Sequence, residues 1–256
     1  MAKFEFIDVQ ASDGVVSITL NRPPLNVLHL AMMAEINTAM EMSLADRSVG
    51  AVVFRAVGKA FSAGVDVADH SVDRVGEMIR QFHGIFRKLL ATDVLTIAAA
   101  QGAALGGGCE LACFCDVVLA GERAKFGQPE VKVGVFPPVA SSVFPLRMGL
   151  GRAIEMNVLG NSVDANEALR LGLVDRVFSH ESFDASVDAY VAQVRQLSRP
   201  VMRLAKRAVF LAAREQILSH LERAESLYLN ELMKLRDAHE GIAAFLEKRE
   251  PNWTHD

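Results

Sequence analysis

Residues 101–130 bring together side chains and backbone that could do chemistry. Three consecutive glycines, 106–108, stand directly before a predicted helix, and Glu110 falls in its first turn. A second carboxylate, Glu130, follows after a short strand-like run. A helix start leaves unpaired N–H groups beside the positive end of the helix dipole, which suits an oxyanion or a phosphate. The segment therefore predicts an anion-holding backbone with two proton-transferring carboxylates nearby.

Other interpretations of these residues remain open at this point. The glycines could serve only close packing of a helix on a sheet. Glu130 follows Pro129 and could be a solvated surface residue, although its neighbours are mostly apolar. The glycine run matches neither the GxGxxG dinucleotide pattern nor a phosphate loop, because no GK[ST] follows. The chain also has no GxSxG elbow, which disfavours a serine hydrolase.

The elements that must position these groups alternate between strands and helices. Strands are expected at 4–9 and 15–20 around a turn at 11–14, followed by a helix through Met32 and Met40 and a strand at 51–54. A helix over 72–90 and strands at 94–100 and 116–120 continue the pattern. Such alternation is typical of parallel βαβ units, so the predicted fold class is α/β. The small-residue loop 59–66 is either a ligand-binding loop or a plain connection.

Composition narrows the function classes. The net charge of −4 gives no reason to expect a nucleic-acid partner, and no stretch is long and apolar enough for a membrane span, so we expect the cytoplasm. Cys109, Cys113 and Cys115 match neither a zinc site nor a CxxC redox pair. We interpret them as small reduced core residues and expect no metal.

The last quarter of the chain has a different pattern. A capped helix ends at Gly172, and from Pro200 almost every segment has helical spacing. We therefore predict a core at 1–195 and a helical region at 196–256. Basic residues between 195 and 214 form either a phosphate site or, more in keeping with helical spacing, a solvated face.

Six ordered segments give the chain a specific resemblance. They are NRPPLNVL at 21–28, KAFSAGVD at 59–66, ALGGGCELACFCD at 104–116, FGQPEVKVG at 126–134, DANEALRLGLVDRV at 164–177 and EGIAAFLEKREPNW at 240–253. With them the sequence resembles the crotonase superfamily, the enoyl-CoA hydratase and isomerase group, over nearly its whole length. The resemblance implies a spiral of ββα repeats followed by helices that trimerise, with a homotrimer or a hexamer as the assembly.

The resemblance also implies roles for the chemistry-bearing residues. The backbone N–H groups of Val65 and Gly107 match the pair that holds the thioester oxygen, and Glu110 and Glu130 match two glutamates that share one water. Keeping both glutamates favours hydration over isomerisation, which needs only one. Which of them is the base and which the acid stays open, because such a pair titrates as a unit.

Coenzyme A would enter as part of an acyl-CoA substrate, with no separate cofactor. The backbone around Ala63 matches the segment that receives the adenine, and Phe245 and Lys248 match C-terminal residues that reach the nucleotide. Asp66, in the same loop as Ala63, is a further candidate for binding the substrate or CoA. The family often has a lysine where this chain has Ala68, which removes one expected phosphate contact.

A second departure concerns the wall after Glu130. Where most hydratases carry a glycine-rich run, residues 134–141 read GVFPPVAS, so Phe136 and Pro138 make the acyl pocket stiffer and more apolar, and the proline removes a backbone donor near the second glutamate. These features resemble the cyclic dienoyl-CoA hydratases of anaerobic aromatic degradation, which act on cyclohexa-1,5-diene-1-carbonyl-CoA. The alternatives are a straight-chain or branched 2-enoyl-CoA hydratase, an enoyl-CoA isomerase, and, from another class, a non-catalytic crotonase-like binding protein.

Overall fold

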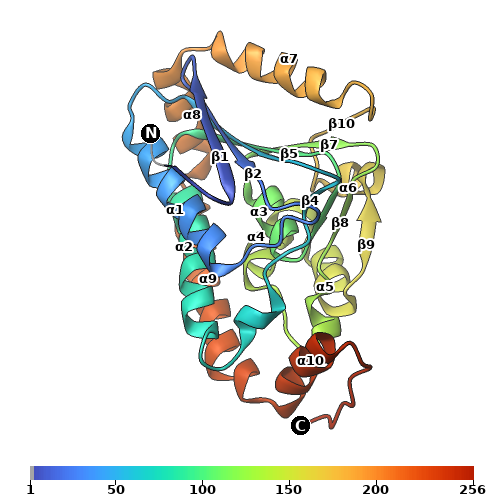
Figure 1. The fold of residues 1–256 in the computed structure, drawn as a ribbon. Helices are drawn as coiled ribbons and strands as arrows, with labels where there is room; N and C mark the ends of the chain where they lie inside the picture. The colour runs from blue at the N-terminus through green and yellow to red at the C-terminus, as the bar shows by residue number, and fades with distance from the viewer. Residues whose placement is uncertain (1–2) are drawn as a thin grey trace.

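The larger of two β-sheets has six strands in the computed structural model, which describes residues 3–256 (Figure 1). Its strands are β1 (Ile7–Ser12), β2 (Val15–Leu20), β3 (Ala51–Ala56), β5 (Leu95–Ala100), β7 (Val117–Gly121) and β10 (Arg176–Phe178). They lie in the order β1-β2-β3-β5-β7-β10, parallel except for β1. The β1–β2 turn is shorter than predicted: Asp13 and Gly14 alone make it, both with positive φ, as a two-residue hairpin requires.

Four three-residue strands form a second, smaller sheet. They are β4 (Ala60–Ser62), β6 (Ala103–Leu105), β8 (Lys125–Gly127) and β9 (Ser162–Asp164). Each of the first three follows a strand of the large sheet, and helices follow β4 and β6 in turn. The chain therefore winds as ββα repeats, which confirms the expected α/β spiral.

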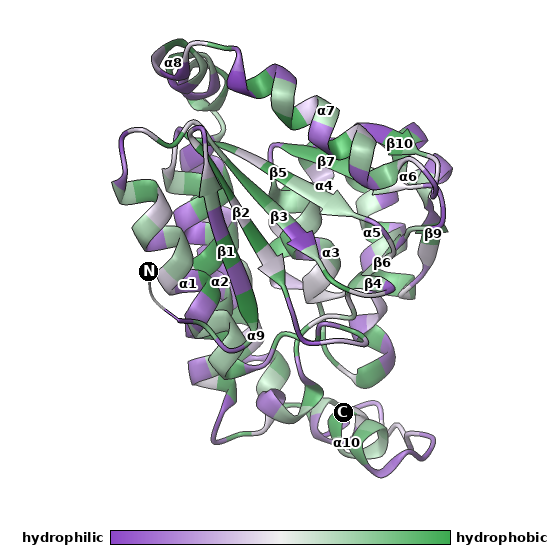
Figure 2. Ribbon diagram, turned by 45° about the horizontal axis from the view of Figure 1, so that its top comes forward, coloured by the Kyte–Doolittle hydropathy of each residue, from purple (hydrophilic) through white to green (hydrophobic). Residues whose placement is uncertain are grey.

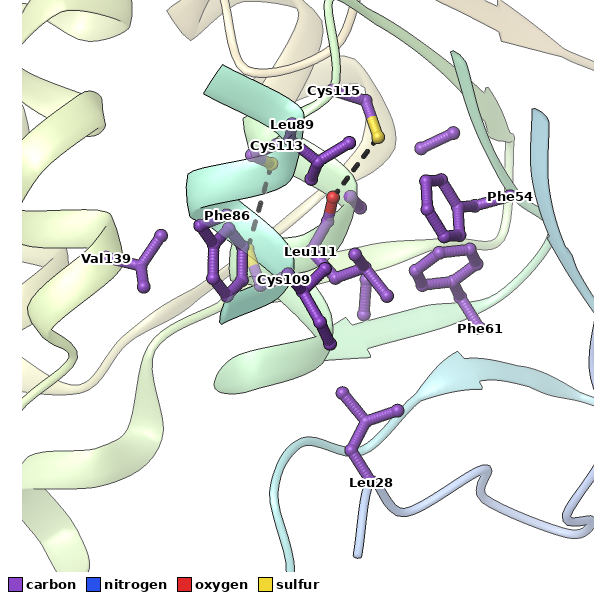
Figure 3. Packing of buried hydrophobic residues seen from close by; sticks show 14 of the residues in the cluster. Leu28, Phe54, Phe61, Phe86, Leu89, Cys109, Leu111, Cys113, Cys115 and Val139 are labelled. Atoms are coloured by element: carbon purple, nitrogen blue, oxygen red, sulfur yellow. Dashed lines mark hydrogen bonds between the residues drawn. The ribbon is translucent and has the colours of Figure 1, made fainter. Parts of the chain in front are cut away.

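The space between the sheets and the helices is the main core. Helices α1 (Leu30–Ala45), α2 (Val75–Ala91), α3 (Gly107–Phe114) and α4 (Pro138–Met148) enclose it. Figure 3 draws part of this core, in which Cys109, Leu111 and Cys113 of α3 belong to the same buried cluster as Phe86 of α2. The three cysteines are buried and free, and the Cys109 and Cys113 sulfurs lie 3.9 Å apart. The interpretation of the cysteines as reduced core residues is confirmed.

Helix α7 (Phe183–Arg195) covers the other face of the large sheet. Its apolar face, with Phe183, Val187 and Val191, packs on inward residues of the strands such as Val53 and Ile97. The central strands are thus buried on both faces, which explains why they read as apolar runs and not as alternating ones (Figure 2).

The remaining helices complete the chain: α5 (Leu150–Leu159), α6 (Ala165–Leu171), α8 (Arg199–Phe210), α9 (Arg214–Asn230) and α10 (Arg236–Glu247), with 3-10 turns η1 (Val67–His70), η2 (Pro129–Val133) and η3 (Leu232–Lys234). Helix α9 packs against α4 and α2, and α10 lies at the far end beside η1 and η2. None of the helices in the part of the chain described is long and apolar enough to cross a membrane.

The basic residues around α8 have a structural use that neither sequence interpretation foresaw. Lys206 Nζ lies 2.7 Å from Asp116, and Arg207 and Arg214 both pair with Asp93, at 2.6 and 2.9 Å. These contacts fasten α8 and the start of α9 to the ends of the large sheet, and they neutralise the charges of Lys206, Arg207 and Arg214. The predicted boundary at residue 195 stays a prediction.

Candidate functional site

A cavity of about 430 Å³ opens between the small-residue loop, the start of α3, η2 and α10. Most of its wall is apolar, from side chains of α2, the segment before α4, and α10. The residues that the sequence nominated and that line it are Ala63, Val65, Gly107, Glu110, Glu130, Phe136, Pro138 and Phe245. The structure therefore brings together eight of the ten predicted site residues, drawn from segments far apart in the chain.

The segment 21–28 holds the loop that carries Ala63 and Val65. Leu28 donates its N–H to Gly64 O at 2.8 Å, and Ala63 N donates to Leu25 O at 2.9 Å. Beneath them the fully buried Asn26 donates from its side-chain amide to the carbonyl oxygens of Val57 and Ala60, both at 2.9 Å. These bonds fix the loop's backbone, so residues 59–66 form a braced part of the site rather than a plain connection.

Each of the three glycines is required for a different reason. A Cβ on Gly106, whose φ is +52°, would lie 2.8 Å from a Glu130 carboxylate oxygen. On Gly107 it would lie 2.7 Å from a Val65 methyl carbon, and on Gly108 only 2.4 Å from Ser62 O. Only Gly108 thus serves the close packing of helix on sheet; Gly106 leaves room for the Glu130 carboxylate, and Gly107 leaves room for the Val65 side chain.

Two backbone N–H groups remain free at this junction. Gly107 is the first residue of α3, so its N–H has no acceptor within the helix. The groups on either side of the Val65 N–H are paired with Leu28: Gly64 O accepts from Leu28 N, and Asp66 N donates to Leu28 O. The Val65 N–H itself has no acceptor in the part of the chain described. Neither N–H has a hydrogen-bond partner among residues 3–256. Both residues line the cavity, so two donors are available there for an anionic oxygen.

Glu110 is the more deeply buried of the two acids. Its side chain is 2% exposed, and the Ala140 N–H at the start of α4 donates to its Oε1 at 2.7 Å. Burial raises the pKa of the Glu110 carboxyl to about 7, while the Ala140 hydrogen bond, which favours the charged form, opposes the rise. The structure thereby corrects one detail of the sequence argument: the helix start that Pro138 opens meets the first glutamate, not the second.

Glu130 stands on η2 and is partly buried. Burial raises its pKa well above the ordinary range, and the neighbouring Glu110 charge raises it further. With its amide nitrogen turned toward Glu130, the buried Gln128 lies 2.9 and 3.1 Å from the two carboxylate oxygens. Raised pKa values favour the protonated form of each acid, and two such acids in one cavity are suited to paired general acid and base chemistry.

Two predicted contacts lie away from the cavity wall. The Asp66 carboxylate accepts from Ala68 N at 3.1 Å and so caps η1. Lys248 ends α10 in the left-handed conformation, is exposed, and is not among the residues that line the cavity.

Among the polar side chains at the site that sequence reasoning missed are four that are buried or partly buried: His70, His83, Gln128 and Tyr228. His70 Nδ1 is held by Asp66 O at 3.1 Å, and His83 Nδ1 by the Glu225 carboxylate at 2.7 Å. Tyr228 sits on α9, a helix whose apolar pattern gives no sign of a cavity. Of these four residues, only Gln128 could have been predicted as a site residue from the sequence, because it stands two residues before Glu130.

The geometry defines a class of protein: an α/β spiral in which two free backbone donors line the same cavity as one buried and one partly buried carboxylate. Residues 10–256 match the family model described as enoyl-CoA hydratase/isomerase. A cyclohexa-1,5-dienecarbonyl-CoA hydratase of Thauera aromatica is 36% identical, over 96% of this chain and 95% of its own. A probable enoyl-CoA hydratase of Mycobacterium bovis is 38% identical, over 98% and 99%.

Solved structures agree. A crystal structure of an enoyl-CoA hydratase from Mycobacterium avium subsp. paratuberculosis superposes with a TM-score of 0.90 at 33% identity, covering 98% of this chain and all of the other. The chain belongs to the enoyl-CoA hydratase/isomerase family. The expected resemblance is confirmed, as is the assignment to an enoyl-CoA hydratase-type enzyme, a hydro-lyase.

Proposed function

We propose that this enzyme adds water reversibly across a C=C bond conjugated to a CoA thioester, and that its substrate is a cyclic dienoyl-CoA such as cyclohexa-1,5-diene-1-carbonyl-CoA. The observation that carries the reaction is the convergence of Glu110, Glu130 and the free amides of Val65 and Gly107 on one cavity. Water and thioester are the only reactants, so the proposed reaction uses no cofactor.

The two amides would hold the thioester oxygen. As the β-carbon is attacked, negative charge moves onto that oxygen, and donors fixed in advance stabilise it without reorganising. One such donor is typically worth about 3 to 4 kcal/mol of transition-state stabilisation. The N-terminal end of α3 adds its dipole to the Gly107 N–H.

We assign the base to Glu110 and the acid to Glu130. The Ala140 N–H favours the ionised form of Glu110, whereas the Glu110 charge disfavours ionisation of Glu130. Glu110 would take the proton of the attacking water, and Glu130 would give its proton to the α-carbon. The role division fails if Glu130→Gln keeps full hydratase activity on a substrate that Glu110→Gln no longer hydrates.

The cyclic acyl group is supported by the cavity wall and by a relative. Phe136 and Pro138, both on the wall, give it rigid apolar surface suited to a ring. The Thauera aromatica relative is named for a cyclic dienoyl substrate. The alternative function is that of a straight-chain or branched 2-enoyl-CoA hydratase. It is supported by the Mycobacterium bovis relative, which is named a probable enoyl-CoA hydratase.

A direct comparison separates these readings. Hydration of cyclohexa-1,5-diene-1-carbonyl-CoA and of crotonyl-CoA is measured side by side as kcat/KM. We expect the cyclic substrate to be preferred. A clear preference for crotonyl-CoA would contradict the proposed cyclic substrate and would support the straight-chain or branched 2-enoyl-CoA hydratase instead. Double-bond migration without hydration would indicate an isomerase. Tight CoA binding with no turnover of any thioester would indicate a non-catalytic binding protein.

We further propose that Ala63 and Phe245, at the cavity, contact the CoA part, and that the chain assembles as a homotrimer or a dimer of trimers. Support for assembly comes from α8, where Val201, Leu204 and Val209 are each more than half exposed. Monomers seldom leave such apolar faces in water. Light scattering at micromolar concentration tests this, and a monomeric mass contradicts it.

A further inference from the structure

The Tyr228 hydroxyl is a polar group that the proposed chemistry leaves unused. The side chain is 1% exposed and lines the same cavity as Glu110 and Glu130. Its oxygen is enclosed and has no hydrogen-bond partner in the described part of the chain. A buried hydroxyl without a partner costs free energy, and native structures retain few of them, so this one calls for a reason.

The ring is held firmly in place. Phe136 packs edge-on against it, with ring centroids 5.3 Å apart and planes at 66°. One turn earlier on α9, Glu225 accepts hydrogen bonds from His83 Nδ1 and Arg87, each at 2.7 Å, which ties this part of α9 to α2. Tyr228 therefore cannot readily turn away to find a partner elsewhere, and whatever satisfies its hydroxyl must come to it.

Both glutamates line the same cavity as the Tyr228 side chain. Burial first, and then the charges of Glu130 and Glu110, raise the pKa of Tyr228. The hydroxyl is therefore protonated at neutral pH and is available to donate a hydrogen bond to a ligand in this cavity. The oxygen that would lie between the glutamates during turnover is that of the attacking water and, after reaction, the β-hydroxyl of the product.

We propose that Tyr228 is a further catalytic residue, whose hydroxyl donates a hydrogen bond to the transferred oxygen. This inference rests on the hydratase function proposed above. The water O–H bond breaks as its proton passes to Glu110, the new C–O bond forms at the β-carbon, and Glu130 protonates the α-carbon. Tyr228 keeps its own proton throughout and fixes the direction from which the oxygen attacks.

The test removes this one oxygen. Tyr228→Phe is compared with Tyr190→Phe, which alters the chain's other tyrosine, on α7 outside the cavity. In the full-length protein we expect Tyr228→Phe to lower kcat/KM for hydration about tenfold, the order of one good hydrogen bond. Tyr190→Phe leaves it unchanged. The midpoint of thermal unfolding should not fall in Tyr228→Phe, because the variant removes an unsatisfied group.

A binding measurement keeps this inference separate from the hydratase proposal. Calorimetry gives the affinities of 3-hydroxybutyryl-CoA and of butyryl-CoA, which differ by the hydroxyl alone. The wild type should prefer the hydroxylated thioester, and Tyr228→Phe should lose about tenfold of that preference. If the preference is absent, or survives in Tyr228→Phe, the inference is wrong even where hydration proceeds. If the preference depends on Tyr228 but no thioester is hydrated, the hydroxyl contact stands and the hydratase proposal falls. If the wild type binds neither of these thioesters, nor the ring pair 2-hydroxycyclohexane-1-carbonyl-CoA and cyclohexane-1-carbonyl-CoA, both fall.

Discussion

Replacing Gly106 by alanine separates the cost of backbone strain from the cost of a displaced carboxylate. Gly106 has φ +52° and ψ −129°, a region open almost only to glycine, so alanine there costs about 1 to 3 kcal/mol of stability. The new Cβ would also lie 2.8 Å from Glu130 Oε1. To reach ordinary van der Waals separation the carboxylate must retreat by roughly 0.6 Å or more.

Gly149 provides the matched control. It lies between α4 and α5 with φ +81° and ψ 156°, an equally glycine-specific conformation, and a Cβ there would meet nothing within 4 Å. Both variants should therefore lower the unfolding midpoint by a similar amount, about 2 to 4 °C for each kcal/mol. Only Gly106→Ala should also disturb the acid.

The assay is kcat/KM for hydration of the better of the two thioesters, beside a thermal melt of each variant. Displacements of about 1 Å at a reacting group can cost about a hundredfold in rate. We expect Gly106→Ala to lose roughly tenfold to a hundredfold and Gly149→Ala to keep wild-type activity. Full activity in Gly106→Ala, or an equal loss in Gly149→Ala, would refute the view that Gly106 makes room for Glu130.

Two further predictions concern proton binding and the brace under the loop. The folded pKa of Glu110 is raised from 4.5 to about 7, so its ionisation costs stability as pH rises through that range. Glu110→Gln should therefore raise the unfolding midpoint relative to wild type more at pH 8 than at pH 5. An equal difference at the two pH values would contradict the raised pKa. Asn26→Ala leaves the carbonyls of Val57 and Ala60 without this donor, so we expect the free energy of unfolding in urea to fall by about 2 to 3 kcal/mol and hydratase activity to fall with it. The control, Asn21→Ala, loses only an exposed contact to Asp8 and should change both quantities by little.

The longer elements could be predicted from sequence because each carries its own periodic signal. The apolar run at Ala51–Ala56 and the amphipathic pattern of Val75–Ala91 fall where expected, to within a few residues. Strands β4, β6 and β8 could not be found this way. Three residues are too few to show a period, and they are strands only because neighbouring repeats pair with them.

Site residues that stand in a short sequence motif could be predicted, whereas those brought to the cavity by helix packing could not. Glu110 and Glu130 stand in recognisable segments, and both line the cavity. Tyr228 comes from a helix that reaches the cavity only by packing against α4 and α2. Asp66 was nominated for its place in a motif, yet its carboxylate is used to cap η1.

The start of α4 links substrate choice to acid strength. Pro138 opens this helix and lines the cavity, while Ala140, two residues on, supplies the N–H that favours the ionised form of Glu110. A change that reshapes the wall by moving this helix start also lengthens or shortens the Ala140 hydrogen bond. Longer bonds weaken the support for the carboxylate and raise its pKa further. If Glu110 is the base, as proposed, substitutions at Phe136 or Pro138 that admit a different acyl group should therefore also shift the acidic limb of the kcat/KM profile, because the pocket wall and the Glu110 carboxyl share this helix start.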